Sequence, residues 1–325
     1  MAFHPSNIKL RTGEPVCFRF KECLLYGMLH HPPSGAIPQE TGIVILNPGP
    51  TDRNGPHRLY FELAERFATE GYPVLRFDAR GVGESEGEWN EGIEGSPILD
   101  VFTEIQKGIW VPDTEAAINF IISRTGVHDV VLGGLCGGAI TALLAGAEHP
   151  KVLGMFLMGT PITLSSATSR IEDLPEQVLR RDARMYIEKL LRPSAWFRLL
   201  TLKTDFSTFW GVLKSRLCFW TKPRKTMATE TINTKMNPLF IQNFKLAVTG
   251  RKKVILIYSE NDYLWHEFKE YFLPSLGNES THSFDLTTLP NANHNVTETD
   301  CQDKLQSVLL SWLVSFTNPV TSDRK

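Results

Sequence analysis

Short apolar runs alternate with amphipathic stretches through the first 160 residues of this chain. A continuous apolar run, which is typical of a buried strand, lies at 42–47, and further strands are predicted within 72–81, where a turn follows, and at 130–134 and 152–159. Between them, apolar residues recur at helical spacing in 57–71, 113–126 and 139–150, where Asp113 is a candidate N-cap. Two earlier runs, 16–20 and 23–31, predict a hairpin.

The alternation resumes near the C-terminus after a long interval. Residues 253–259 and 284–289 predict two further strands. A final helix is predicted from one apolar stripe, which consists of Leu305, Val308, Leu309, Trp312, Leu313 and Phe316. The order of elements therefore predicts an α/β fold, with a mostly parallel sheet and helices on both of its faces.

The interval 161–252 interrupts the alternation of strands and helices. Its sequence predicts helical segments that are rich in basic and bulky aromatic residues. Residues 165–253 contain 18 of the 34 Lys and Arg residues but only 7 of the 36 Asp and Glu residues, a net charge of +11. Such an asymmetry is typical of a separate module or of a face with its own partner. We therefore expect a helical cap over 161–252, inserted into one core made of 1–160 and 253–325.

Composition and charge exclude several classes of protein. The 325 residues are 42% hydrophobic and carry a net charge of −2, which favours a globular protein and gives no reason to expect nucleic acid as a partner. The opening MAFHPSNIKLRTGEPV lacks the apolar segment of a secretory signal, and no apolar run is long enough for a transmembrane helix. The five cysteines are scattered without C-x-x-C spacing, which argues against disulfides and a zinc site and favours the cytoplasm.

The segment GLCGG, residues 134–138, follows a predicted strand and precedes a predicted helix. In a nucleophile elbow of the form G-x-Nuc-x-G, glycines are needed because the nucleophile has a strained backbone and the strand and helix approach closely. The helix N-terminus also favours a thiolate over a thiol. This pattern makes Cys136 a candidate nucleophile. The alternative interpretation is a buried structural cysteine among tightly packed glycines.

Two residues further along the chain favour the first interpretation. A nucleophile of this kind requires a base and an acid that orients the base, in the order nucleophile, acid, base. Asp262 and His294 each come just after a predicted strand, in that order. We therefore predict a catalytic triad of Cys136, His294 and Asp262.

Each of the two later members of the triad has a competitor. His57 also lies in a loop that we expect at the active edge of the sheet, but no carboxylate is placed to orient it as well as Asp262 orients His294. Glu260 is the competing acid, because it lies two residues nearer the end of the strand than Asp262.

The loop NPGPTDRNG, which follows the strand 42–47, is expected to complete an oxyanion hole. Such a hole is normally formed by two backbone N–H groups, one just after the nucleophile and one in this loop. Gly137 supplies the first. Pro48 and Pro50 have no N–H, so the second donor is Gly49 or Thr51, and Gly49 is our choice. The alternative is a simple Pro/Gly turn.

Other residues are candidates for substrate binding or for bracing the loops at this edge. Thr51, His57 and Trp210 are candidate substrate-binding residues. In the turn-rich connection DARGVGESEG, Asp78 and Arg80 are expected to brace the loop rather than contact substrate. No metal ligand or cofactor-binding motif is predicted.

These motifs together resemble the α/β-hydrolase superfamily, in which DARGVGES is similar to a connection of the form Asp-x-Arg-Gly-x-Gly-x-Ser. More narrowly, NPGPTDRNGPHR, YPVLRFDARGVGESEG, GLCGGAITALL and YIEKLLRPSAWFRLLT resemble the exosortase A system-associated hydrolases (type 1). The chain departs from that family at 90–110, which has the pattern of an extra loop, and at Gly137, where an acidic residue is expected. The resemblance implies an intracellular hydrolase with a role near envelope or exopolysaccharide export.

The function predicted from these features is hydrolysis of an ester or thioester through an acyl-thioester on Cys136. Acyl transfer to an alcohol or amine is the first alternative, because a thioester intermediate resists water better than it resists amines or thiols. A non-catalytic binding scaffold is the second alternative. The basic cap would suit an acyl group carried by coenzyme A or a phosphopantetheinyl protein, or peripheral contact with an anionic membrane surface.

Overall fold

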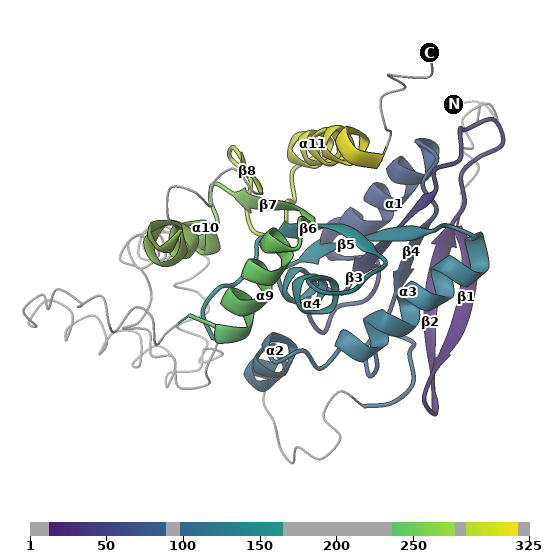
Figure 1. The fold of residues 1–325 in the computed structure, drawn as a ribbon, viewed down its shortest axis with the longest axis horizontal. Coiled ribbons are helices and arrows are strands. Elements are labelled where there is room, and N and C mark those ends of the chain that lie inside the picture. The colour runs from purple at the N-terminus through teal and green to yellow at the C-terminus, as the bar shows by residue number, and fades with distance from the viewer. Residues whose placement is uncertain (1–12, 89–97, 165–235, 277–283, 318–325) are drawn as a thin grey trace, which may run out of the picture. The chain divides into compact units, whose positions relative to one another are not determined.

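A single eight-stranded sheet organises the part of the chain that the computed structural model describes, namely residues 13–88, 98–164, 236–276 and 284–317 (Figure 1). Its strands follow the order β1-β2-β4-β3-β5-β6-β7-β8. They are β1 Gly13–Phe20, β2 Cys23–His30, β3 Thr41–Leu46, β4 Val74–Phe77, β5 Asp129–Leu135, β6 Val152–Met158, β7 Lys253–Ser259 and β8 Asp285–Leu289.

The sheet is parallel from β4 to β8, and only its first edge is antiparallel. β1 pairs with β2 as the predicted hairpin, and β2 pairs antiparallel with β4. The central strands β3 and β4 are buried at every position, which explains why their sequences are apolar runs rather than alternating patterns. The prediction of a mostly parallel sheet is therefore confirmed.

Helices cover both faces of the sheet, as the sequence predicts (Figure 1). α1 (Leu59–Thr69) and α11 (Thr299–Thr317) pack on one face, with the predicted stripe of α11 facing the core. α2 (Ile98–Gln106), α3 (Val111–Thr125), α4 (Gly137–Gly146) and α9 (Pro238–Thr249) pack on the other. No helix among the described residues is both long and apolar enough to cross a membrane.

Shorter helical turns lie at the ends of the parallel strands. A 3-10 turn, η2 (Pro56–Arg58), precedes α1. After β7 the chain forms α10 (Tyr263–Glu267), a π-helical turn η4 (Phe268–Phe272) and a 3-10 turn η5 (Leu273–Ser275).

Two segments differ from the sequence-based expectation. The expected extra loop over 90–110 contains α2, whose Val101 and Ile105 are buried one turn apart in the core. α9 falls inside the range expected for the cap, but its buried Phe240 and Phe244 belong to the core. Most of the expected cap, residues 165–235, lies outside the described residues, and this part includes Trp210.

The start of α3 also differs from the expectation. The helix begins at Val111, after an N-cap at Trp110, so Asp113 is not the cap. Its carboxylate is instead fully buried and accepts hydrogen bonds from the backbone N–H and the guanidinium Nε of Arg80. This ion pair joins α3 to the loop that follows β4.

Candidate active site

The parallel strands bring their carboxyl ends to one edge of the sheet, and most candidate residues follow these ends. Cys136 comes directly after β5, Asp262 shortly after β7 and His294 shortly after β8, while Gly49 follows β3. Because neighbouring strands of a parallel sheet end at the same edge, residues far apart in sequence meet there.

Cys136 has the backbone conformation of a nucleophile elbow. Its φ of 56° and ψ of −114° place it outside the regions that non-glycine residues ordinarily adopt. The neighbouring glycines are required by contact, since a Cβ added to Gly134 would lie 2.8 Å from the carbonyl oxygen of Leu46, and one added to Gly138 would lie 2.3 Å from it. The strand β3 therefore leaves no room for side chains on either side of the cysteine.

Buried hydrogen bonds hold the elbow in place. The Cys136 N–H donates to the carbonyl oxygen of Met158 at 2.8 Å. The Leu135 N–H donates to the hydroxyl oxygen of Tyr60 at 2.7 Å, which connects the end of β5 to α1. Burial, partly offset by the hydrogen bond from Leu135, raises the pKa of Tyr60, so its hydroxyl stays neutral. The strained turn is therefore supported from both sides.

Asp262 and His294 form the predicted pair. Asp262 is buried, and its Oδ2 lies 2.6 Å from Nδ1 of His294. Its other oxygen accepts a hydrogen bond from the Leu264 N–H at the start of α10, so the carboxylate is fixed at both oxygens. The competing Glu260 accepts from the backbone N–H of Asn291 at 3.0 Å and braces the loop after β8.

The electrostatics of His294 join it to both of its predicted partners. Burial lowers the pKa of His294, but hydrogen bonds with Asp262 and Cys136, together with the charge of both groups, outweigh burial and raise the pKa to about 10. The imidazole therefore holds its second proton at neutral pH, beside the sulfur of Cys136.

The oxyanion side of the site differs from the prediction. The Gly137 N–H donates to the carbonyl oxygen of Pro48 at 3.0 Å, so this N–H is occupied by the protein itself. That carbonyl and the N–H of Gly49 belong to one trans peptide and point in opposite directions. In this conformation the two predicted donors, Gly137 and Gly49, do not face a common point.

Sequence reasoning missed the contribution of α2 to this side. The ring of Phe102 lies against Gly49, where an added Cβ would be 3.0 Å from its Cε1 atom, and Ile105 approaches Gly137 in the same way. Both residues lie on the helix that was expected to be a loop. The apolar spacing in ILDVFTEIQ is the signal that could have identified it.

Tyr263 is a second neighbour that the sequence did not indicate. It follows Asp262 at the start of α10 and is 43% exposed. Desolvation, followed by the charges of Cys136 and Glu267, raises the pKa of Tyr263, so its side chain lies within electrostatic reach of the cysteine. Nothing in its sequence context distinguishes this tyrosine from an ordinary surface residue.

Two of the three candidate substrate-binding residues, Thr51 and His57, lie in the described part of the chain. Thr51 and His57 are exposed, and within the described parts of the chain neither side chain makes a hydrogen bond or ion pair. The backbone oxygen of Thr51 accepts a hydrogen bond from the amide of Asn47. Trp210 lies outside the described residues. Their binding roles therefore stay predictions.

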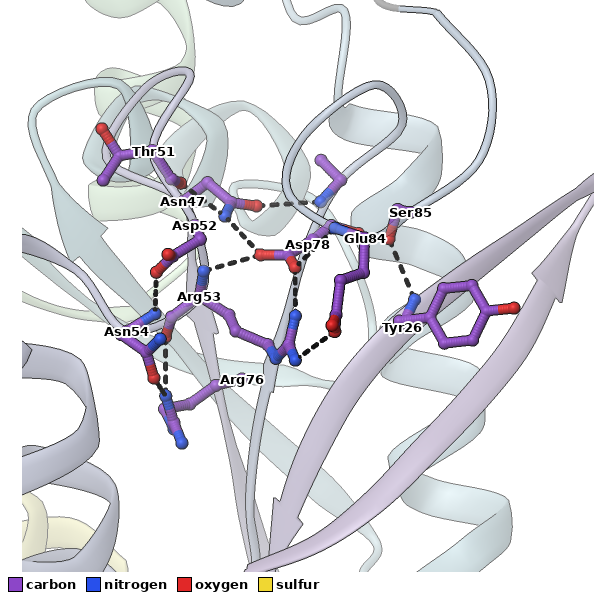
Figure 2. Close-up of polar contacts among 11 residues, drawn as sticks. Tyr26, Asn47, Thr51, Asp52, Arg53, Asn54, Arg76, Asp78, Glu84 and Ser85 are labelled. Carbon is purple, nitrogen blue, oxygen red and sulfur yellow. Dashed lines mark hydrogen bonds and ion pairs between the residues drawn. The ribbon is translucent and has the colours of Figure 1, made fainter.

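Asp78 braces its own loop, as expected, through the Glu84 N–H, and it also holds the oxyanion loop after β3. Figure 2 shows its buried carboxylate among Arg53, Asn47 and Glu84. It accepts hydrogen bonds from the backbone N–H and the guanidinium of Arg53, and from the Asn47 amide at 3.4 Å. The Asn47 side chain in turn donates to the Thr51 carbonyl and accepts from the backbone N–H of Ala79. This network ties the loop after β3 to the loop after β4.

Across the described ranges, no group of three or more His, Cys, Asp or Glu side chains is arranged to hold a metal ion. The four cysteines in these ranges, Cys17, Cys23, Cys136 and Cys301, are all free thiols. At this edge the described residues bring together a thiol, an imidazole and a carboxylate.

Comparison with known proteins agrees with the fold. A family model described as the alpha/beta hydrolase fold matches residues 42–276. The solved structure of the esterase Pf2001 from Pyrococcus furiosus is 16% identical with a TM-score of 0.55, and the match covers 95% of this chain and 92% of that chain. XC6422 from Xanthomonas campestris, a serine hydrolase without a lid, is 12% identical with a TM-score of 0.52, over 95% of this chain and 96% of that chain.

A dienelactone hydrolase from Anabaena variabilis is 16% identical with a TM-score of 0.52, over 94% of this chain and 98% of that chain. At these identities the structural matches show the fold alone. No curated protein matches the chain by sequence.

Proposed function

Because the chain belongs to the α/β-hydrolase family, we propose that it cleaves an ester or thioester with Cys136 as nucleophile, His294 as base and Asp262 as the acid that orients the base. The observation that carries this proposal is the 2.6 Å contact between Asp262 and His294, beside a cysteine at a strained strand-to-helix turn. A scaffold that only binds a ligand has no need of these three groups together. The chemistry needs no metal or cofactor.

In the proposed reaction, the Cys136 sulfur attacks the carbonyl carbon, and an electron pair moves onto the carbonyl oxygen. As this tetrahedral oxyanion collapses, the bond to the leaving oxygen or sulfur breaks, and the His294 imidazolium gives that atom its proton. The products are an acyl-thioester on Cys136 and a neutral imidazole. His294 then takes a proton from water as the water oxygen attacks the thioester. Cys136 leaves as a thiolate and the acid is released.

The oxyanion requires a change in the loop after β3. Rotation of the peptide between Pro48 and Gly49 would release the Gly137 N–H and turn the Gly49 N–H toward it. The two orientations are related as the central peptides of type I and type II turns, and the second needs a positive φ that glycine adopts readily. We propose that substrate binding stabilises the rotated peptide, in which both N–H groups bind the oxyanion.

An acyl-enzyme experiment tests the proposed nucleophile. The protein is mixed with a p-nitrophenyl ester series or an acyl-thioester series, and intact-mass spectra are recorded at short times. We expect a transient mass increase equal to the acyl group, located on Cys136 by peptide mapping. Cys136→Ala should lose turnover on the order of 10³-fold or more, while Cys301→Ala, which removes another free thiol, should keep it. Equal turnover by Cys136→Ala and wild type would refute the proposal.

Alkylation distinguishes a catalytic cysteine from a cysteine in a binding scaffold. The positive charge of the His294 imidazolium beside the sulfur should make Cys136 more reactive, so iodoacetamide at pH 6.5 should modify Cys136 faster than the exposed Cys17 of the same molecule. The His294→Asn variant should remove this advantage. Equal rates at the two cysteines in the wild-type protein favour the scaffold.

Acyl transfer uses the same acyl-enzyme and differs only in the acceptor. It is favoured by the thioester intermediate, which reacts more readily with amines and thiols than with water. Added amine or alcohol should then compete with water for the acyl group, and the ratio of the two products measures the partition. A product ratio that does not respond to the acceptor concentration leaves hydrolysis as the activity.

The partners, the location and the narrower family are further proposals. A coenzyme A or carrier-protein substrate, or an anionic membrane surface, would bind the basic segment 165–253, most of which lies outside the described residues. The resemblance to exosortase A system-associated hydrolases and the cytoplasmic location are proposed on the sequence motifs alone. Salt titration of binding to acyl-coenzyme A and to anionic vesicles tests the charge argument, and a flat response to both would refute it.

A further inference from the structure

A cavity of about 350 Å³ lies between β2, β4 and the start of α1, and none of the proposed catalytic residues lines it. Its lining residues are Met28, Arg53, Asn54, Arg58, Phe61 and Arg76. Three of these six residues are arginines. A concentration of guanidinium groups around one cavity is unusual, because buried cations normally have anionic partners close by.

Arg76 is the most deeply buried of the three arginines, at 2% exposure. Its Nε donates to Nε2 of His30 at 3.0 Å, and its Nη1 donates to the Arg53 carbonyl and the Asn54 side-chain oxygen (Figure 2). All three acceptors are uncharged. Within the described ranges, no carboxylate lies within ion-pair distance of Arg76, and its Nη2 makes no hydrogen bond. The charge of this side chain is therefore not neutralised by direct contact.

His30 separates Arg76 from the nearest acid. Since a guanidinium only donates, Nε2 of His30 must accept, and the ring proton is on Nδ1, which donates to Oε1 of Glu65 at 2.7 Å. Burial and the charge of Arg76 lower the pKa of His30 to about 4, so the ring is neutral at physiological pH. The carboxylate of Glu65 therefore reaches the imidazole but not the guanidinium.

The remaining walls combine a second cation with apolar surface. The guanidinium of Arg58 lies over the Phe61 ring at 4.6 Å, and that of Arg76 lies over the same ring at 5.4 Å. Arg58 has only a 3.6 Å contact with Glu62, and its side chain is 60% exposed. Arg53, by contrast, is occupied by Asp78 and Glu84. The cavity thus has two cations that are available to a ligand.

We propose that this cavity binds a small organic phosphate, whose phosphoryl oxygens accept hydrogen bonds from Arg76 and Arg58 and whose apolar part lies against Phe61 and Met28. A phosphate monoester matches the two available positive charges with its own charge of nearly −2 at neutral pH. Guanidinium groups bind phosphate in a two-pronged geometry. The first turn of α1, which follows Arg58, adds positive potential, although its Leu59 and Tyr60 N–H groups already donate to the carbonyl oxygens of Pro56 and Asn54.

Calorimetric titration with phenyl phosphate, with inorganic phosphate and with phenol tests the proposal on the whole chain. We expect phenyl phosphate to bind more tightly than inorganic phosphate, because only the ester also contacts Phe61 and Met28, and phenol to give no signal. The Arg58→Gln variant should weaken binding of phenyl phosphate about tenfold without affecting folding, since Arg58 is largely exposed. Arg66→Gln, on the same helix but outside the cavity, is the matched control.

A second variant and a lipid arm make the outcome unambiguous. Arg76→Lys keeps a positive charge but loses the two-pronged geometry, so it should also weaken binding, with folding checked by circular dichroism. Vesicles with and without phosphatidic acid distinguish a lipid headgroup from a free phosphate ester as the natural source. Arg58-dependent binding in either arm supports the phosphate site. Absence of binding in both arms, or equal affinity of wild type and Arg58→Gln, overturns it.

Discussion

The nucleophile side and the oxyanion side of the site are held by different kinds of contact. Around Cys136, the backbone of β3 excludes every side chain larger than hydrogen at Gly134 and Gly138, and buried hydrogen bonds fix the turn. On the oxyanion side, the Gly137 N–H is occupied by a single hydrogen bond, which it donates to the Pro48 carbonyl.

This difference indicates which part of the site is preorganised. The elbow, Asp262 and His294 cannot move without breaking close contacts or buried hydrogen bonds, so the proposed attacking groups are already in place. A single rotation of the peptide between Pro48 and Gly49 turns the Pro48 carbonyl away from the site and the Gly49 N–H toward it. We infer that binding of substrate is coupled to that rotation, whereas the triad stays fixed.

Asp262→Asn should have the largest effect, because it removes the charge that holds the proton on His294. We expect kcat to fall by roughly 10²- to 10⁴-fold. The pKa of His294, measured by NMR titration, should fall from about 10 toward the usual value near 6.5. Asp303→Asn, on the exposed side of α11, serves as the control. An unchanged His294 pKa in Asp262→Asn would contradict the assigned pair.

The same pair makes the stability of the fold depend on pH. The pKa of His294 is raised on folding, so its contribution to the free energy of unfolding is complete below about pH 6.5 and is lost as the pH rises through about 10. The stability difference between wild type and His294→Asn should therefore shrink between pH 7 and pH 10 in urea denaturation. A constant difference over that range would argue against the raised pKa.

Gly49→Ala should separate the two sides of the site. The added methyl group meets the Phe102 ring at about 3.0 Å, and it disfavours a positive φ by roughly 1–2 kcal/mol. We expect kcat to fall roughly 10- to 100-fold while iodoacetamide still alkylates Cys136 at the wild-type rate. The double variant with Phe102→Ala relieves the ring contact but not the φ restriction, so most of the loss should remain.

Gly35→Ala is the matched control for that substitution. Gly35 also has a positive φ, but nothing surrounds the position of an added Cβ and the residue lies away from the catalytic edge. Its variant should lose stability without a loss of kcat. If Gly49→Ala slows alkylation of Cys136 as much as it slows turnover, the two sides are not independent and the comparison fails.

The nucleophile side was predictable because the residues that determine its geometry can be identified in the sequence. Glycines at 134 and 138 are the trace of a close strand-to-helix contact, and the strand ends locate Asp262 and His294. The orientation of the Pro48 peptide leaves no such trace, because both orientations suit the same Pro-Gly sequence. Only the contact with Gly137 distinguishes them.

Two other features escaped prediction for different reasons. α2 is a short helix beyond a polar, glycine-containing stretch, so its buried Val101 and Ile105 were interpreted as part of a loop. Arg76 did leave a signal, a charged residue inside the apolar strand VLRF, but its partners come from β2 and from the loop that follows β3. Tertiary contacts of this kind cannot be inferred from local pattern.

Asn47→Ala should weaken the brace of the oxyanion loop with a smaller effect on catalysis. It leaves the Ala79 N–H and the Thr51 carbonyl without their partner, at a cost of about 1–3 kcal/mol of unfolding free energy. We expect kcat to fall only a few-fold, because the peptide at Gly49 keeps both of its orientations. Asp52→Ala, at an exposed position of the same loop, should change stability by less. Denaturant unfolding and initial rates measure the two quantities.

Glu260→Gln should have the smallest effect, and it tests whether the acid is correctly assigned. Glu260 and Asp262 follow the same strand, and sequence alone allows either to orient His294. The carboxylate of Glu260, however, accepts from the Asn291 N–H, and a neutral glutamine oxygen can accept the same bond. We therefore expect kcat within about twofold of wild type and an unchanged His294 pKa. A loss comparable to that of Asp262→Asn would move the acid to Glu260 and make Asp262 a helix cap.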